Sequence, residues 1–128
     1  MNYPTDLRYS RDHEWIRVNG GTARIGITDF AQKQLGDLVY VEQPSVGGTF
    51  DAGEPFGSVE SVKAVTEVYS PVAGEVVAVN EKLNHEPELI NDDPYGDGWL
   101  IEISVRDGDP LRELMTASQY EAYLKSEE

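Results

Sequence analysis

The 128-residue sequence contains no cysteine, which excludes disulfides, thiolate catalysis and cysteine-based zinc sites. No stretch approaches the roughly 20 apolar residues that a membrane-spanning helix needs. Basic side chains are also scarce, because 10 lysines and arginines stand against 24 acids, giving a net charge of −14. This charge argues against nucleic acid and anionic membranes as partners, since their phosphates bind lysine and arginine.

The N-terminus lacks the features of a targeting sequence. Residues 1–6 have neither the basic start and apolar run of a secretory signal nor the arginine- and serine-rich character of a transit peptide. We therefore expect a cytoplasmic protein, most simply a bacterial one. The length and a hydrophobic content of 39% predict a single domain, residues 1–128, with a core at about 7–105 and a helical tail at about 109–126.

Short apolar stretches separated by glycine and proline predict a mostly β fold. Residues 19–21, Asn-Gly-Gly, favour a hairpin between strands at 14–18 and 22–27. A short helix should follow, with Thr28 as its N-cap and Gly36 at its end. Further strands are expected at 38–42, 46–50, 56–60, 64–69, 75–79 and 99–105.

The remaining segments give weaker signals. Residues 81–98 are polar and contain prolines, which predicts an irregular segment. Asp109 can cap a C-terminal helix, and Ser118 with Glu121 has the spacing of a capping box for its last turn. We expect Gly53 and Gly74 at the tight corners of a small flattened barrel.

Lys63 lies at a bend that lacks the usual turn residues. No glycine, proline, asparagine or aspartate occurs between Ser58 and Ser70, although strands are expected on both sides of the lysine. Tight hairpins use such residues because they tolerate positive φ. A bend that breaks local rules is typical of a functional position, so we expect an exposed lysine that another protein modifies.

The other reactive side chains form no complete catalytic set. His13 with Glu14 could be a base and its orienting acid, but no nucleophile accompanies them, so a structural or partner-facing His13 is favoured. His85 lies in a polar segment and is expected to be solvated. Ser61 and Lys63 lack the oxyanion motif of a Ser–Lys dyad. We expect no enzymatic activity.

The acidic segment near residue 95 invites a calcium-site interpretation, which its spacing does not support. Asp92, Asp93 and Asp97 precede a glycine, but Tyr95 and Ser104 occupy positions where an EF-hand loop needs oxygen ligands. The two histidines also lack metal-ligand spacing. We therefore expect no metal site.

Several segments, in the same order along about 7–123, resemble the H-protein family of the glycine cleavage system. Each segment is weak by itself, whereas together they are specific. The segments are His13-Glu14-Trp15, Gly26-Ile27-Thr28-Asp29, Leu35-Gly36-Asp37 through Val39-Tyr40-Val41-Glu42, Glu60-Ser61-Val62-Lys63-Ala64, 70–76, 87–91 and 94–99.

This resemblance implies a lipoyl-domain-like barrel-sandwich hybrid, made of two small antiparallel sheets with a short internal helix and a C-terminal helix. It implies a carrier with lipoate in amide linkage to Lys63. The cofactor would supply the sulfur chemistry that the cysteine-free chain lacks. The implied modification motif consists of Glu60, Ser61, Val62 and Ala64.

The resemblance also implies a set of partner enzymes. The arm would accept an aminomethyl group from a PLP-dependent glycine decarboxylase and deliver it to a tetrahydrofolate-dependent aminomethyltransferase. An FAD-dependent dihydrolipoyl dehydrogenase would then reoxidise the arm. Attachment of the cofactor requires a lipoate ligase or a lipoyl/octanoyl transferase.

The loaded arm in this family is expected to fold back against the protein, which shelters its amine from water. We predict that Glu14, Glu67 and Asp12 hold this cation, because carboxylates stabilise a partly desolvated ammonium. Asp12 is the least typical of the three, since similar proteins often have a small hydroxyl residue there.

Three alternatives share the exposed lysine. A lipoyl relay would pass its cofactor to 2-oxoacid dehydrogenase complexes. A biotinyl carrier would be expected to have methionines where Val62 and Ala64 stand. An acidic interaction domain would leave Lys63 unmodified. A fourth possibility, a self-contained hydrolase, is the least favoured, because no nucleophile–base arrangement is present.

Overall fold

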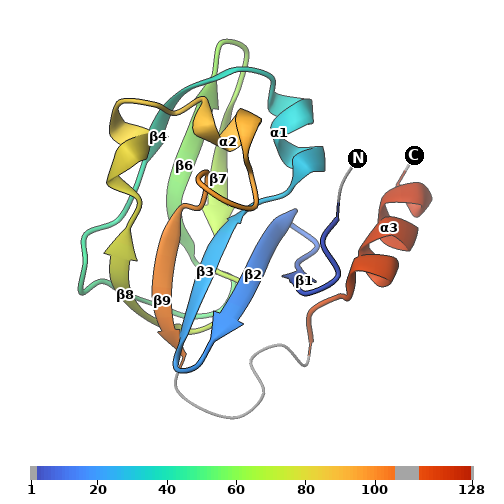
Figure 1. Ribbon diagram of the computed structural model, residues 1–128, viewed down its shortest axis with the longest axis horizontal. Coiled ribbons are helices and arrows are strands. Elements are labelled where there is room, and N and C mark those ends of the chain that lie inside the picture. Colours follow the sequence, from blue (N-terminus) through green and yellow to red (C-terminus); the bar gives the residue numbers. More distant parts are fainter. Residues whose placement is uncertain (1–2, 106–112, 128) are drawn as a thin grey trace.

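The computed structural model describes residues 3–105 and 113–127 (Figure 1). Within these residues the strands form two antiparallel sheets, one in the order β1-β2-β3-β9-β8-β5 and one in the order β4-β6-β7. The predicted mostly β class with two antiparallel sheets is confirmed. The strands are β1 (Arg8–Tyr9), β2 (Glu14–Asn19), β3 (Thr22–Ile27), β4 (Leu38–Glu42), β5 (Thr49–Phe50), β6 (Pro55–Ser61), β7 (Val65–Tyr69), β8 (Gly74–Val79) and β9 (Ile101–Val105).

The β2–β3 hairpin and the internal helix form where the sequence predicts them. Asn19 pairs with Thr22, and Gly20 turns the chain with a φ of 66°. Helix α1 (Asp29–Leu35) begins after Thr28, whose side chain accepts a hydrogen bond from the Ala31 N–H at 3.2 Å. Gly36 ends the helix with a φ of 82°, a conformation that glycine adopts without steric cost.

The segment predicted to be irregular contains two short helices, so that prediction was wrong. They are the 3-10 helix η1 (Glu81–Asn84) and the helix α2 (Leu89–Asp92). Each places one aliphatic side chain, Leu83 or Ile90, in the core at no more than 1% exposure. A single buried residue in four gives no helical periodicity, so tertiary packing rather than a local pattern fixes both helices.

The C-terminal helix α3 (Ala117–Ser126) begins two residues earlier than its predicted capping box. Thr116 caps it, and the Gln119 side chain accepts from the Thr116 N–H at 2.9 Å, so the Ser118–Glu121 box was wrong. Met115 is not helical either, because it forms a β-bridge with Tyr9. The helix start predicted at Asp109 lies outside the described residues.

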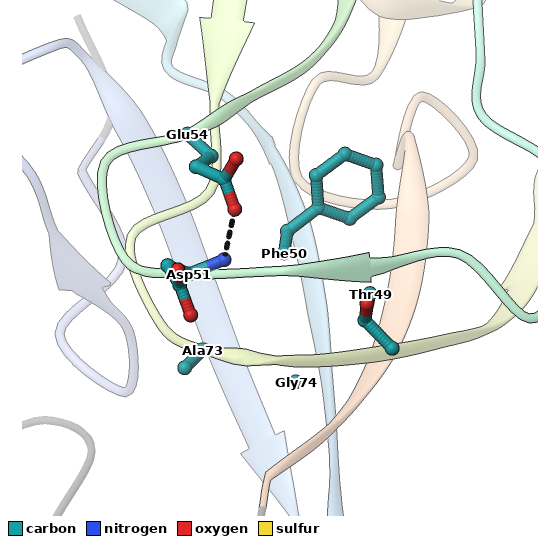
Figure 2. A pocket seen from close by; sticks show the side chains of 6 residues that line it. All are labelled: Thr49, Phe50, Asp51, Glu54, Ala73 and Gly74. Atoms are coloured by element: carbon teal, nitrogen blue, oxygen red, sulfur yellow. Dashed lines mark hydrogen bonds between the residues drawn. The ribbon is translucent and has the colours of Figure 1, made fainter.

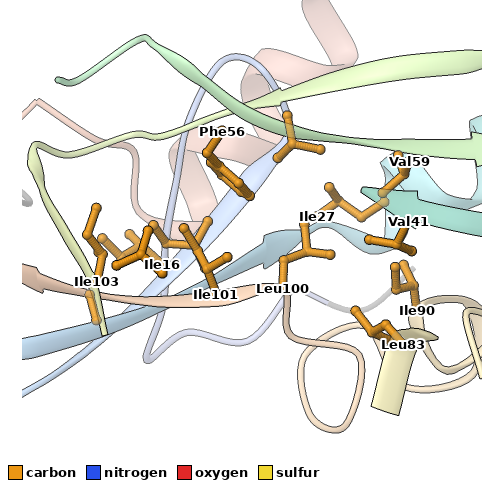
Figure 3. Close-up of a cluster of buried hydrophobic side chains, with 14 of the residues drawn as sticks. Ile16, Ile27, Val41, Phe56, Val59, Leu83, Ile90, Leu100, Ile101 and Ile103 are labelled. Carbon is orange, nitrogen blue, oxygen red and sulfur yellow. The ribbon is translucent and has the colours of Figure 1, made fainter. Parts of the chain in front are cut away.

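Among the described residues, two hydrophobic clusters hold these elements together. The larger lies between the sheets and includes Ile16, Ile101 and Ile103 from the six-stranded sheet and Phe56 and Val59 from the three-stranded one (Figure 3). The smaller cluster packs α3 against β1 and β2. It consists of Leu7, Tyr9, Trp15, Tyr95, Ala117, Tyr120 and Leu124.

The two glycines expected at corners have different roles. Gly53 turns the chain with a φ of 89°, as predicted. Gly74 is instead the first residue of β8, where it lies opposite Val105. A Cβ at Gly74 would overlap the Ser104 carbonyl oxygen, so this glycine permits close approach of two strands rather than a turn.

Candidate functional site

Lys63 is exposed in the connection between β6 and β7, and the β6–β7 hairpin projects from one end of the molecule (Figure 1). The Ser61 N–H donates to the Ala64 carbonyl at 2.8 Å. The buried Ser61 hydroxyl oxygen also accepts from the N–H groups of Ala64 and Lys63, at 3.1 and 3.3 Å. This serine closes the turn, which explains why the sequence needs no glycine or asparagine there.

The connection between α1 and β4 lies beside the lysine. A Cβ on Gly36 would be 3.6 Å from Lys63 Cε. Asn91 of α2 holds this connection, since its amide donates to the Gly36 carbonyl and to Gln32 Oε1, both at 2.9 Å. The side-chain oxygen of Asn91, Oδ1, accepts from the Leu38 N–H at 2.9 Å. No separate role was predicted for Asn91, although it lies in a segment that carries the family resemblance.

A pocket of about 260 Å³, the α1–β7 pocket, lies next to this connection. It brings together all three predicted shelter residues from β2, from the segment before it and from β7. Leu35, the residue before Gly36, is part of its wall. The lining residues are Asp12, His13, Glu14, Ile27, Phe30, Ala31, Gln34, Leu35, Val59, Thr66, Glu67 and Val68.

Glu14 is the buried carboxyl group of this pocket, with an exposure of 2%. Its Oε1 accepts from the Ser10 hydroxyl at 2.8 Å, and its Oε2 accepts from the Tyr69 N–H at 2.9 Å. Burial raises the pKa of Glu14 to about 7 despite these hydrogen bonds, which favour the ionised form. A carboxylate has acceptor capacity for donors beyond these two.

The other two predicted shelter residues are more exposed. Asp12 is exposed in the segment before β2. Glu67 pairs with Ser58, between Thr66 and the buried Val68. Strand alternation therefore places its side chain on the outer face of the sheet, although its position contributes to the pocket wall. All three residues line one pocket, but only the carboxyl group of Glu14 is buried, whereas Asp12 and Glu67 are exposed.

His13 has a structural contact that the sequence did not specify. It adopts a φ of 68°, and its Nδ1 lies 2.8 Å from the Tyr120 hydroxyl of α3. That hydroxyl is also 2.8 Å from Thr28 Oγ1. Burial lowers the pKa of His13, which favours the neutral imidazole. His13 thus links α3 to the pocket and to the N-cap of α1, which supports the structural interpretation.

A second pocket, of about 290 Å³, is a less suitable candidate site (Figure 2). In it the Glu54 carboxylate accepts from the Asp51 N–H at 2.7 Å, which occupies that acid in a local turn. Lys63 is not among its lining residues. The pocket is lined by Thr49, Phe50, Asp51, Glu54, Ala73 and Gly74.

The remaining candidates have local roles. His85 is exposed at the end of η1, and the Asp93 carboxylate accepts from the Asp97 N–H at 2.9 Å. In residues 3–105 and 113–127, no three or more histidine and acidic side chains are grouped so that they could hold a metal ion. No helix in these ranges is long and apolar enough to cross a membrane.

Comparison with known proteins gives a consistent result. The profile of a family described as "Glycine cleavage H-protein" matches residues 7–127. A glycine cleavage system H protein of Anoxybacillus flavithermus is 55% identical over 127 residues, covering 99% of this chain and all of that protein. A Bacillus cereus protein of the same name is 52% identical over 120 residues, 94% of each chain.

The fold is similar to that of a solved relative. The crystal structure of a glycine cleavage system H protein from Mycobacterium marinum matches with a TM-score of 0.88 and 42% sequence identity. The match covers 96% of this chain and 99% of that one.

Proposed function

Because this chain belongs to the glycine cleavage H-protein family, we propose that Lys63 is the residue to which its lipoyl group is attached. The members of this family are the lipoyl carriers of the glycine cleavage system, and this chain serves that function. A carrier needs no catalytic set of its own. When attached, the lipoyl group supplies a dithiolane that accepts and releases the aminomethyl carbon of glycine.

The observation that carries the proposal is the surroundings of Lys63. All four lysines, Lys33, Lys63, Lys82 and Lys125, are exposed, so exposure alone does not distinguish them. Lys63 differs because it lies in a hairpin turn closed by Ser61 and beside the Cβ-free backbone of Gly36. A fixed turn presents one lysine to a partner in a defined geometry.

The α1–β7 pocket suits the predicted sheltering of the loaded arm. Lysine with a lipoyl chain reaches on the order of 14 Å, judged from ordinary bond lengths. The pocket combines apolar walls, which suit a hydrocarbon arm, with the buried carboxyl group of Glu14. A cationic amine in the pocket would lower the pKa of Glu14 and stabilise its ionised form. Asp12 and Glu67 would add negative potential from the exposed side.

We further propose that this chain meets the three enzymes named by the resemblance, together with an enzyme that attaches lipoate. Replacing Lys63 with Arg should abolish glycine breakdown when the wild-type carrier supports it in a mixture of those enzymes. The matched variant Lys33→Arg should retain activity. Streptavidin capture against an anti-lipoyl blot distinguishes a biotinyl carrier, and loss of lipoylation elsewhere after deletion of this protein would indicate a lipoyl relay.

The shelter is tested by the lifetime of the loaded carrier. Glu14→Gln removes the buried carboxylate and should shorten the lifetime of the bound aminomethyl group, whereas Glu67→Gln should have a smaller effect. Equal lifetimes for wild type and Glu14→Gln would contradict the proposed role of Glu14 in sheltering the amine.

A further inference from the structure

Four large apolar side chains are exposed around the Lys63 turn. Val62 is 81% exposed and Val65 is 65% exposed, on either side of the lysine in sequence. Val39 and Tyr40 of the neighbouring strand β4 are 49% and 56% exposed. These four residues, Val39, Tyr40, Val62 and Val65, are called the tip patch below. Such a concentration is unexpected on a chain with a net charge of −14.

Strand register places two members of the tip patch, Tyr40 and Val65, on one face of the three-stranded sheet. Tyr40 pairs with Glu60, and Glu60 pairs with Val65, so these three residues form one row across β4, β6 and β7. Paired residues in antiparallel strands point to the same face of a sheet. A register shift between Leu38 and Tyr40 accompanies the exposure of both Val39 and Tyr40.

Acidic residues border the patch. Glu60 lies within the row, and the next row on the same face contains Glu42, Ser58 and Glu67. Beyond Glu60, which is half-buried, Glu42 and Glu67 are both exposed. A complementary surface therefore has an apolar centre with lysines and arginines around it.

We propose that the tip patch is the docking surface for the acyl-transferring enzyme that forms the amide on Lys63, an inference that rests on the proposed function of this lysine. That enzyme must bring an acyl carbonyl carbon to within bonding distance of Lys63 Nζ. It therefore has to contact the residues that immediately surround the turn. The other partners act on the far end of the arm, on the order of 14 Å away by ordinary bond lengths, and have no such requirement.

The chemistry of the step defines the partner further. The acyl donor is an activated carboxylic acid, either an acyl adenylate or a thioester. A C–N bond forms between Nζ and the carbonyl carbon, while the bond from that carbon to the adenylate oxygen or the thiol sulfur breaks. The lysine ammonium gives up two protons in total, to the leaving group and to a base on the partner enzyme, and nothing is oxidised or reduced.

The test compares two matched pairs of valines. Val39→Ser with Val65→Ser removes apolar area from the tip patch, whereas Val46→Ser with Val77→Ser removes it elsewhere, at residues 61% and 42% exposed. Acylation of each apo protein by lipoate ligase with lipoate and ATP is followed by intact mass. We expect kcat/KM to fall on the order of tenfold for the patch variant and to stay unchanged for the other pair.

A second measurement isolates docking of this one enzyme. The same variants, lipoylated by prolonged incubation, are reduced and then reoxidised by dihydrolipoyl dehydrogenase. Reoxidation at the wild-type rate supports the proposal. Unchanged acylation of the patch variant would overturn it, and so would an equal loss in both reactions. If the wild-type protein itself is not acylated on Lys63, the proposed function fails instead.

Discussion

At the scale of single residues, Ser61 stabilises the turn at Lys63 and takes the place of the glycine or asparagine of an ordinary hairpin. Its side-chain oxygen accepts two backbone N–H groups, and its own N–H donates to the Ala64 carbonyl. Within the described residues His13 is the only non-glycine residue with positive φ, so the turn at Lys63 is made without that conformation. A serine in this role leaves the neighbouring positions available for recognition.

Ser61→Ala should therefore loosen the turn without unfolding the protein. Loss of the hydroxyl acceptor should cost about 1 kcal/mol locally, because solvent can replace part of the hydrogen bonding at an exposed turn. Amide hydrogen exchange at Lys63 and Ala64 should accelerate roughly fivefold, which corresponds to that free energy. Ser58→Ala, in the same strand, serves as the control. Unchanged exchange at both amides would contradict the role of Ser61.

Glu14 gives a pH-dependent prediction. Its pKa rises from 4.5 to about 7 on folding, so the folded state binds more protons than the unfolded state between these values. The free energy of unfolding should then decrease as pH rises from about 4.5 to about 7, by on the order of 3 kcal/mol from this group, and level off above that range.

Denaturant unfolding at pH 5 and pH 8 measures this effect. Glu14→Gln should show a smaller difference in stability between the two pH values than wild type, whatever its absolute stability. The exposed Glu75→Gln should keep the wild-type difference. An unchanged difference in Glu14→Gln would mean that another group causes the pH dependence.

At the scale of elements, the parts with local signals could be predicted and the parts fixed by packing could not. Thr28 and Gly36 mark the ends of α1 by chemistry that acts within a few residues. Helix α2 has no such signal, because its position depends on burying Ile90 and on placing Asn91 against a connection more than 50 residues earlier in the chain. Long-range requirements of this kind are not visible in a local pattern.

The same contrast applies to the candidate site. Lys63 was singled out because its bend departs from ordinary turn chemistry, and Glu14 because of the family resemblance. Burial of Glu14 could not be predicted, because one of its hydrogen-bond partners, the Tyr69 N–H, lies 55 residues later in the chain. Gly74 was misassigned for a related reason: a glycine that allows close approach of strands has the same sequence signature as one in a turn.

Asn91→Ala should destabilise the connection beside Lys63. It removes three hydrogen bonds at once, so the free energy of unfolding should fall by about 2 to 3 kcal/mol. Asn84→Ala, at an exposed position of η1, should change it by less than about 0.5 kcal/mol. Chemical denaturation distinguishes the two variants, and equal stabilities would show that Asn91 does not hold this connection.

At the scale of the whole molecule, two features shape encounters with partners. We propose that α3 folds with the sheets as one domain, because Tyr120 is fully buried and its hydroxyl meets both His13 and Thr28. The net charge of −14 is then carried by a single domain. Long-range attraction by basic surfaces should bring partners close before the arm engages.

Encounter rates should therefore depend on salt. For the lipoylated carrier, kcat/KM with glycine decarboxylase should decrease on the order of tenfold from low to physiological ionic strength, because screening shortens the range of attraction. A steady-state series in sodium chloride measures this, with a small free lipoyl compound as the uncharged control. Salt independence of the protein substrate would show that the surface charge only maintains solubility.

The central claim is that the lipoyl group is carried on Lys63 alone, and peptide mapping by mass spectrometry tests it most directly. After incubation of the chain with lipoate, ATP and lipoate ligase, we predict a mass increase of one lipoyl group, located on the peptide that contains Lys63. The Lys63→Arg variant should gain none. Attachment to Lys33, Lys82 or Lys125, or no attachment to the wild-type chain, would contradict the account.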